Sequence, residues 1–170
     1  MQITTNEPYA LRNDEGVTDV WWPFNPTPVV GRYTSKVTSD RTEGRLFQML
    51  ISEGRGAAPP LHIHRDADET IYVIEGELTV FVGDERIEVR AGDFVFGPRG
   101  VPHAFLVVSE EARFLATFAP AGIGAFFAEI APPVVPGEPR PDPVPVDPVE
   151  FASVAGRYAI EIVGPPPVLD

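Results

Sequence analysis

The stretch that decides the fold covers residues 56–76 and reads GAAPPLHIHRDADETIYVIEG. It holds two of the three histidines of the chain, His62 and His64, and runs on into an apolar, alternating segment that begins at Glu69. Residues i and i+2 of a strand point to the same side, so the two imidazoles face one way. The histidines gather in strand patterns whose ends are marked by Gly and Pro. This favours one metal centre inside a small β-barrel.

The third histidine, His103, lies in a second stretch, GDFVFGPRGVPHAF, at residues 92–105. It also begins a strand pattern, so it can lie beside the first pair. Three neutral imidazoles and the carboxylate of Glu69 suit a borderline divalent ion. Each piece alone has a structural explanation: paired core or surface imidazoles, a solvated loop charge, and a turn residue after Pro102. The joint spacing favours the metal centre.

Composition excludes several classes of protein. The 170 residues are enough for one domain with extensions, and the net charge of −12 disfavours nucleic acid and anionic membranes as partners. The absence of cysteine excludes disulfides, thiolate nucleophiles and Cys-ligated zinc. Residues 1–16 have no signal-peptide core, and no apolar run approaches the roughly 18 residues of a membrane span. We therefore expect a cytoplasmic protein.

Short alternating runs with β-branched and aromatic residues follow one another between Gly-, Pro- and Asp-containing turns. Many short strands at this spacing are typical of an antiparallel sandwich or barrel. The predicted strands cover residues 31–39, 45–52, 69–76, 78–83, 86–90, 93–97, 103–108 and 112–120.

The flanks differ from this central region in composition. We expect residues 1–30 to form an extended segment that packs on a barrel of residues 31–120, because its prolines exclude a central strand. Its tryptophans, Trp21 and Trp22, either cover an edge or end of the barrel or a neighbouring subunit, or form the aromatic rim of a ligand pocket.

The C-terminal region, residues 121–170, combines helix signals with a Pro-rich arm. Apolar residues at i, i+3, i+4 and i+7 predict a short helix from Ile123 to Ile130. The segment 131–146 is expected to be an extended arm. An N-cap at Asp147, a proline after it and Gly156 predict a second helix over about 148–155. Three placements of the arm and its terminal helix stay open: docking on the barrel, covering the pocket as a lid, or crossing to a partner subunit.

The spacing of both stretches resembles the two motifs of the cupin superfamily. Gly56, His62, His64, Glu69 and Gly76 match the first motif, and residues 92–103 match the second after a gap of 15 residues. The resemblance implies an all-β jelly-roll barrel (a double-stranded β-helix), often dimeric. It also implies a set of metal ligands, which comprises His62, His64, Glu69 and His103.

One position departs from the second motif. The family commonly has Asn four residues after the last histidine, where this chain has Val107. Because that Asn is not a ligand, metal binding is unaffected, and Val107 indicates an apolar pocket wall.

Within the superfamily, the chain resembles quercetin 2,3-dioxygenase-like monocupins of actinobacteria. The similarity lies in the four-residue gap before Glu69, the helix GIGAFFAEI and the tail YAIEIVGPPP. It implies a dioxygenase that uses O₂ and one divalent metal, most often Ni, Fe, Co or Mn and also Cu or Zn, on a flavonol-like substrate. Glu69 would then be both ligand and catalytic base. Open alternatives are a metal-dependent isomerase, cyclase or lyase on the same site, and a non-catalytic binding protein; a homodimer is expected in each case.

The period of two also predicts the residues that face the metal. On residues 45–52 the pattern leaves open which of two sets points inward, and we take the set that begins at Phe47 as the candidate. Such a pocket suits a flat or apolar organic molecule and no phosphorylated one. The same residues can also be plain barrel core. The candidate pocket residues are Phe47, Met49, Ile51, Ile71, Val73, Phe105 and Val107.

Overall fold

The computed structural model describes residues 7–24 and 30–169, so the predicted N-terminal segment lies partly outside the described residues. The strands form a six-stranded and a five-stranded sheet, in which neighbouring strands are antiparallel. The first sheet contains, in spatial order, β1 (Thr18–Trp22), β2 (Gly31–Val37), β3 (Phe47–Gly54), β10 (Glu111–Ala119), β5 (Asp68–Glu75) and β8 (Phe94–Gly97). The second contains β11 (Ile160–Gly164), β4 (Leu61–His64), β9 (His103–Val107), β6 (Glu77–Val82) and β7 (Glu85–Arg90).

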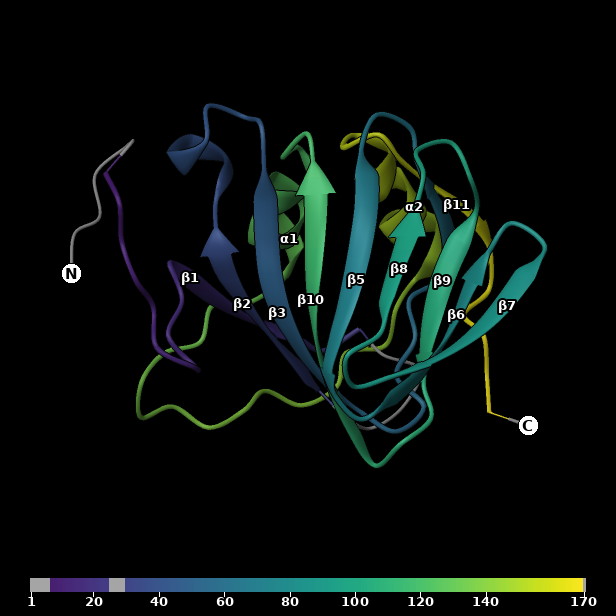
Figure 1. Cartoon of the computed structure of the whole chain (residues 1–170), viewed down its shortest axis with the longest axis horizontal. Coiled ribbons are helices and arrows are strands. Elements are labelled where there is room, and N and C mark those ends of the chain that lie inside the picture. The colour runs from purple at the N-terminus through teal and green to yellow at the C-terminus, as the bar shows by residue number, and fades with distance from the viewer. Residues whose placement is uncertain (1–6, 25–29, 170) are drawn as a thin grey trace.

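This arrangement confirms the predicted all-β cupin fold. Each predicted run between residues 31 and 120 forms a strand, and the two sheets enclose the core between them (Figure 1). Alternation is clear in β10, where Ala112, Phe114, Ala116 and Phe118 are buried and the residues between them are partly exposed. The strands therefore form because their apolar residues recur at every second position.

Both sheets extend beyond the predicted barrel. β1 pairs with β2, and Pro23 follows directly after it, which fits a strand at the edge of a sheet. At the other end of the chain β11 pairs with β4, with Ile160 opposite His64 and Ile162 opposite His62. The C-terminal segment thus returns to the strand that carries the first two histidines.

The two predicted helices are confirmed as α1 (Ile123–Ile130) and α2 (Pro148–Gly156). They lie behind the sheets in the view of Figure 1. The side chain of Asp147 caps α2, because it accepts hydrogen bonds from the backbone N–H groups of Val149 (2.8 Å) and Glu150 (3.1 Å). A short 3₁₀ helix covers Ser39–Arg41.

The Pro-rich arm runs along β1 of its own chain. The N–H of Val134 donates to the carbonyl of Asp19 (3.0 Å), and the N–H of Val144 donates to that of Pro23 (3.0 Å). The guanidinium of Arg140 lies 5.7 Å from the ring centre of Trp21, a cation–π contact. In the described part of the chain, no helix is both long and apolar enough to cross a membrane.

Candidate metal centre

The four predicted ligand side chains converge between the two sheets. His62 and His64 come from β4, His103 from β9 and Glu69 from β5. Their ligand atoms all lie within 4.8 Å of one another, and the group can hold a metal ion. Since His62 stands directly opposite His103 in the five-stranded sheet and Glu69 faces them from the six-stranded sheet, the centre forms only when the sheets pack together.

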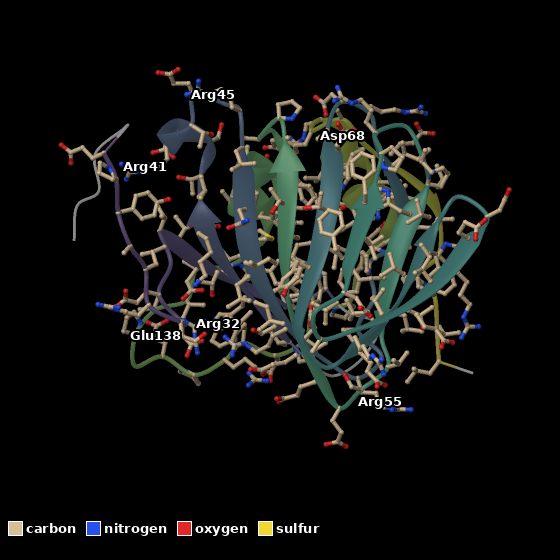
Figure 2. All side chains as sticks on the ribbon, in the orientation of Figure 1. Arg32, Arg41, Arg45, Arg55, Asp68 and Glu138 are labelled. Carbon is tan, nitrogen blue, oxygen red and sulfur yellow. The ribbon has the colours of Figure 1, made fainter. Side chains whose placement is uncertain are left out.

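A pair of exposed residues ties the two motifs together beside the site. Asp68, at the beginning of β5 (Figure 2), accepts hydrogen bonds from the backbone N–H (2.9 Å) and the guanidinium (2.7 and 3.0 Å) of Arg99. These bonds hold the pKa of Asp68 at about 2. The turn that precedes His103 is thereby fixed next to Glu69, a role for Arg99 that the sequence pattern did not indicate.

Backbone carbonyls orient two of the imidazoles. The carbonyl oxygen of Pro60 lies 2.8 Å from Nδ1 of His62, and that of Val101 lies 2.9 Å from Nδ1 of His103. A carbonyl only accepts, so each Nδ1 carries the hydrogen. In the neutral ring the lone pair is then on Nε2, which is the atom that a metal binds.

The ligand atoms are better arranged to bind a cation than to satisfy one another by hydrogen bonds. Nε2 of His64 is buried and has no hydrogen-bond partner, although it lies 3.2 Å from Oε2 of Glu69. Nε2 of His103 lies 2.9 Å from the same oxygen. Two lone-pair atoms at this distance need a proton or a metal ion between them. Buried polar atoms rarely lack a partner, and this donor set is one that divalent transition metals prefer.

The charges of the site follow from burial and from these contacts. Burial, together with the neighbouring His103 and His64, lowers the pKa of His62 to about 3, so this ring is neutral at physiological pH. Burial opposes ionisation of Glu69, but its contacts with His103 and His64 outweigh burial and hold its pKa well below the usual range. For His103, burial lowers the pKa and the contact with Glu69 raises it by more, so the net shift is upward.

A mostly apolar cavity adjoins the four candidate ligands. Three of the predicted pocket residues, Ile51, Ile71 and Phe105, line it. The other four are buried in the core but are not part of its lining, because the inward face of each strand extends past the cavity. These residues are Phe47, Met49, Val73 and Val107.

Much of the cavity wall comes from flanking elements that the pocket prediction did not include. Trp22 of β1 lines it and stacks on Tyr33 of β2, with ring centres 5.2 Å apart and planes at 7°. Trp21 faces the arm, since neighbouring residues of a strand point to opposite faces. The apolar stripe of α1 was a usable signal for its own three wall residues, whereas the sequence pattern gave no such signal for those of α2 and β11. The further flanking residues of the wall are Ile123, Phe126, Phe127, Phe151, Ile160 and Ile162.

The two antiparallel sheets and the group of three histidines and one glutamate between them agree with the resemblance to the cupins. Residues 49–118 match the model of the cupin domain. The chain therefore contains a cupin domain and resembles quercetinase-like cupins.

Comparison with known proteins finds relatives that are similar in sequence to this chain. Quercetin 2,3-dioxygenase of Bacillus subtilis (strain 168) is 31% identical over 128 residues, which cover 74% of this chain and 35% of that protein. An uncharacterized protein of Streptomyces coelicolor is 40% identical over 53 residues, or 31% of this chain and 50% of that one. The chain thus spans half or less of each of these relatives.

A solved structure shares the fold. The structure of a predicted oxalate decarboxylase from Thermotoga maritima superposes with a TM-score of 0.51 and 18% identity, over 53% of this chain and 80% of that one. At this identity the likeness concerns the fold alone.

Proposed function

We propose that the protein is a metal-dependent dioxygenase that oxidises or cleaves a flavonol-like aromatic or enolic substrate with O₂. The observation that carries the proposal is the double position of Glu69. Its carboxylate belongs to the group that can hold a metal, and it also lines the apolar cavity. The similarity to quercetin 2,3-dioxygenase of Bacillus subtilis supports the choice of substrate class.

The proposal assigns the metal to four side chains. His62, His64 and His103 would bind it through Nε2, and Glu69 through a carboxylate oxygen. Ni, Fe, Co and Mn are the expected metals, and Cu and Zn suit the same donors. When bound, a divalent ion supplies Lewis-acid chemistry, which lowers the pKa of a coordinated hydroxyl. Fe or Cu would also supply redox chemistry.

In this proposal Glu69 accepts the proton of the enolic or phenolic hydroxyl of the substrate. A carboxylate is ionised at neutral pH, as a proton acceptor must be. The apolar walls at Ile71 and Phe105 hold the flat rings of the substrate and exclude water from the reacting oxygen. The imidazoles keep their orientation through the carbonyls of Pro60 and Val101.

Oxygen uptake tests the proposal directly. Protein loaded separately with Fe, Ni, Co or Mn is incubated with flavonols and catechols in an oxygen-electrode cell, and products are identified by mass spectrometry. We expect O₂ consumption in proportion to the substrate lost. Turnover that proceeds without O₂ would assign the site to an isomerase, cyclase or lyase. Binding without turnover under all loadings would assign it to a non-catalytic binding protein.

We also propose that the protein is a homodimer joined through the outer face of β5 and β8. β8 is an edge strand, and Tyr72 stands opposite Phe94 in the register. Two copies that each carry a net charge of −12 repel, so an uncharged patch is where they can meet. Four apolar side chains on this face are exposed: Phe94 (61%), Phe96 (53%), Tyr72 (45%) and Ile74 (38%).

The molar mass in solution tests the dimer. Full burial of an aromatic side chain covers about 150–250 Å², and about half of each aromatic residue in the patch is exposed, so the patch supplies part of the roughly 800 Å² that each partner of a stable interface buries. We expect light scattering to give twice the chain mass for the wild type and one chain mass for Phe94→Lys. A wild type that stays monomeric would contradict the proposal. We propose separately that the protein is cytoplasmic, and cell fractionation tests this location.

A further inference from the structure

We infer that the cavity selects substrates whose body, beyond the metal-binding oxygens, carries no hydroxyl groups. The inference rests on the proposed binding of a flavonol-like molecule at the metal centre and specifies the kind that binds best. It favours 3-hydroxyflavone, whose only hydroxyl is the enolic one beside the keto group, over quercetin, which adds hydroxyls on both outer rings.

The polar atoms of the cavity wall lie at one end. The four ligand side chains form that end, and the strands and helices beyond it contribute aliphatic and aromatic side chains. Among the lining side chains of the described residues, only Trp22 and Tyr33 add a further polar atom. Within residues 7–24 and 30–169, the wall contains no lysine, arginine, asparagine or glutamine side chain. The cavity can thus bind the chelating oxygens of a substrate at the metal centre. It offers few hydrogen-bond partners to polar groups on the rest of the substrate.

Even the hydroxyl of Tyr33 is engaged elsewhere. It donates to Oε1 of Glu53, a buried carboxylate on β3, at 3.0 Å. The ring of Tyr33 meanwhile lies against Trp22 in a parallel stack and against Phe127 edge-on, with ring centres 5.5 Å apart. These contacts fix the tyrosine with its hydrogen committed, so it serves the cavity as an aromatic surface.

A hydroxyl that enters such a cavity loses its hydrogen bonds to water and regains few. The loss is unfavourable, and an apolar site discriminates against an added hydroxyl by up to roughly 100-fold. Stacking on the aromatic wall is retained whether or not the rings carry hydroxyls. The difference between the two flavonols therefore isolates the polar groups.

Part of the wall that imposes this preference lies outside the matched cupin domain of residues 49–118. Phe126 and Phe127 come from α1, Phe151 from α2, and Ile160 and Ile162 from β11. The edge-to-face contact between Phe126 and Phe151, with ring centres 5.8 Å apart, joins the two helices over the cavity. The preference is accordingly shared by residues inside the matched domain, such as Ile71 and Phe105, and by the C-terminal elements, whereas all four candidate metal ligands lie inside that domain.

The test is anaerobic binding of both flavonols to the nickel-loaded protein, measured by isothermal titration calorimetry and by quenching of tryptophan fluorescence. We expect 3-hydroxyflavone to bind at least about tenfold more tightly than quercetin. Equal affinities, or tighter binding of quercetin, would overturn the inference. Tight binding of 3-hydroxyflavone without O₂ consumption would refute the dioxygenase proposal while leaving the inference in place.

A pair of variants locates the effect. Ile71→Thr adds a hydroxyl to the cavity wall, whereas Val163→Thr adds one at an exposed position of β11, outside the cavity lining. We expect the affinity ratio of the two flavonols to shrink at least threefold in Ile71→Thr and to stay unchanged in Val163→Thr, with thermal unfolding as the check on folding. A ratio that is unaltered in a folded Ile71→Thr would contradict the assignment to the cavity wall.

Discussion

At the scale of single residues, Glu69 is the side chain to which the proposed function assigns both metal binding and proton transfer. Its oxygen Oε2 lies 2.9 Å from Nε2 of His103 and 3.2 Å from Nε2 of His64, so it is held by the same atoms that would share the metal. A carboxylate in this position neutralises part of the charge of a divalent ion. It also stands within reach of a hydroxyl that approaches through the cavity.

Replacing Glu69 by glutamine separates these two contributions. The amide keeps the shape and one potential ligand oxygen but accepts no proton, so turnover should fall at least about 100-fold. The metal content should fall much less, because the three histidines remain. Steady-state kinetics and elemental analysis on the same sample measure both. If turnover and metal content fell by the same factor, Glu69 would be a ligand only.

Tyr33 should leave a signature in the alkaline stability of the protein. Burial, and then the charge and hydrogen bond of Glu53, raise the pKa of its phenol well above 10 in the folded chain. The unfolded chain ionises near 10, so this contribution is complete below pH 10 and is lost as the pH rises above it. We expect the free energy of unfolding of the wild type to fall more steeply above pH 10 than that of Tyr33→Phe, in chemical denaturation at matched pH values.

The Tyr33→Phe substitution should also lower the free energy of unfolding near neutral pH. Tyr33→Phe should be less stable by about 1–3 kcal/mol at pH 8, because the buried carboxylate of Glu53 loses a donor. Identical pH slopes for the two proteins would show that the phenol ionises freely and would contradict the burial of the pair.

The convergence of the four candidate ligands could be predicted from the sequence because each motif is local. His62 and His64 are fixed by alternation within one strand, and His103 by the turn before it. The pocket was predicted only in part. Alternation identifies the inward face of a strand but gives no depth along the barrel, so Ile71 lines the cavity whereas Val73, on the same face, is packed in the core.

At the scale of secondary-structure elements, helices with local signals were predictable and long-range pairings were not. The apolar spacing of α1 and the cap of α2 are contained in a few residues each. β11 forms because residues 160–164 pair with β4, almost a hundred positions earlier in the chain. Its residues alone do not specify this partner, and the same holds for the contacts of the arm with β1.

The cap of α2 offers a test at this scale. Asp147→Ala removes both side-chain bonds to the first turn and should lower the free energy of unfolding by about 0.5–2 kcal/mol. Because Phe151 of α2 lines the cavity, flavonol affinity should weaken as well. Chemical denaturation and calorimetry measure the two effects. Asp142→Ala, the same change at an exposed arm position, is the control, and an equal loss in both variants would contradict the role of the cap.

At the scale of the whole molecule, the two sheets have different duties at one site. The five-stranded sheet presents three imidazoles, and the six-stranded sheet presents the carboxylate and much of the inner wall. The C-terminal region closes the arrangement by adding β11 to the histidine strand and both helices to the cavity. The stretch of residues 56–76 is thus half of a centre that only the assembled barrel completes.

The central claim is that these four side chains bind one divalent transition metal. Elemental analysis of protein purified without added metal tests it most directly, with His62→Ala and His103→Ala prepared alongside. We expect about one divalent ion per chain in the wild type and almost none in either variant, since each loses a donor from the buried set. Equal metal content in all three folded proteins would contradict the assignment of the site.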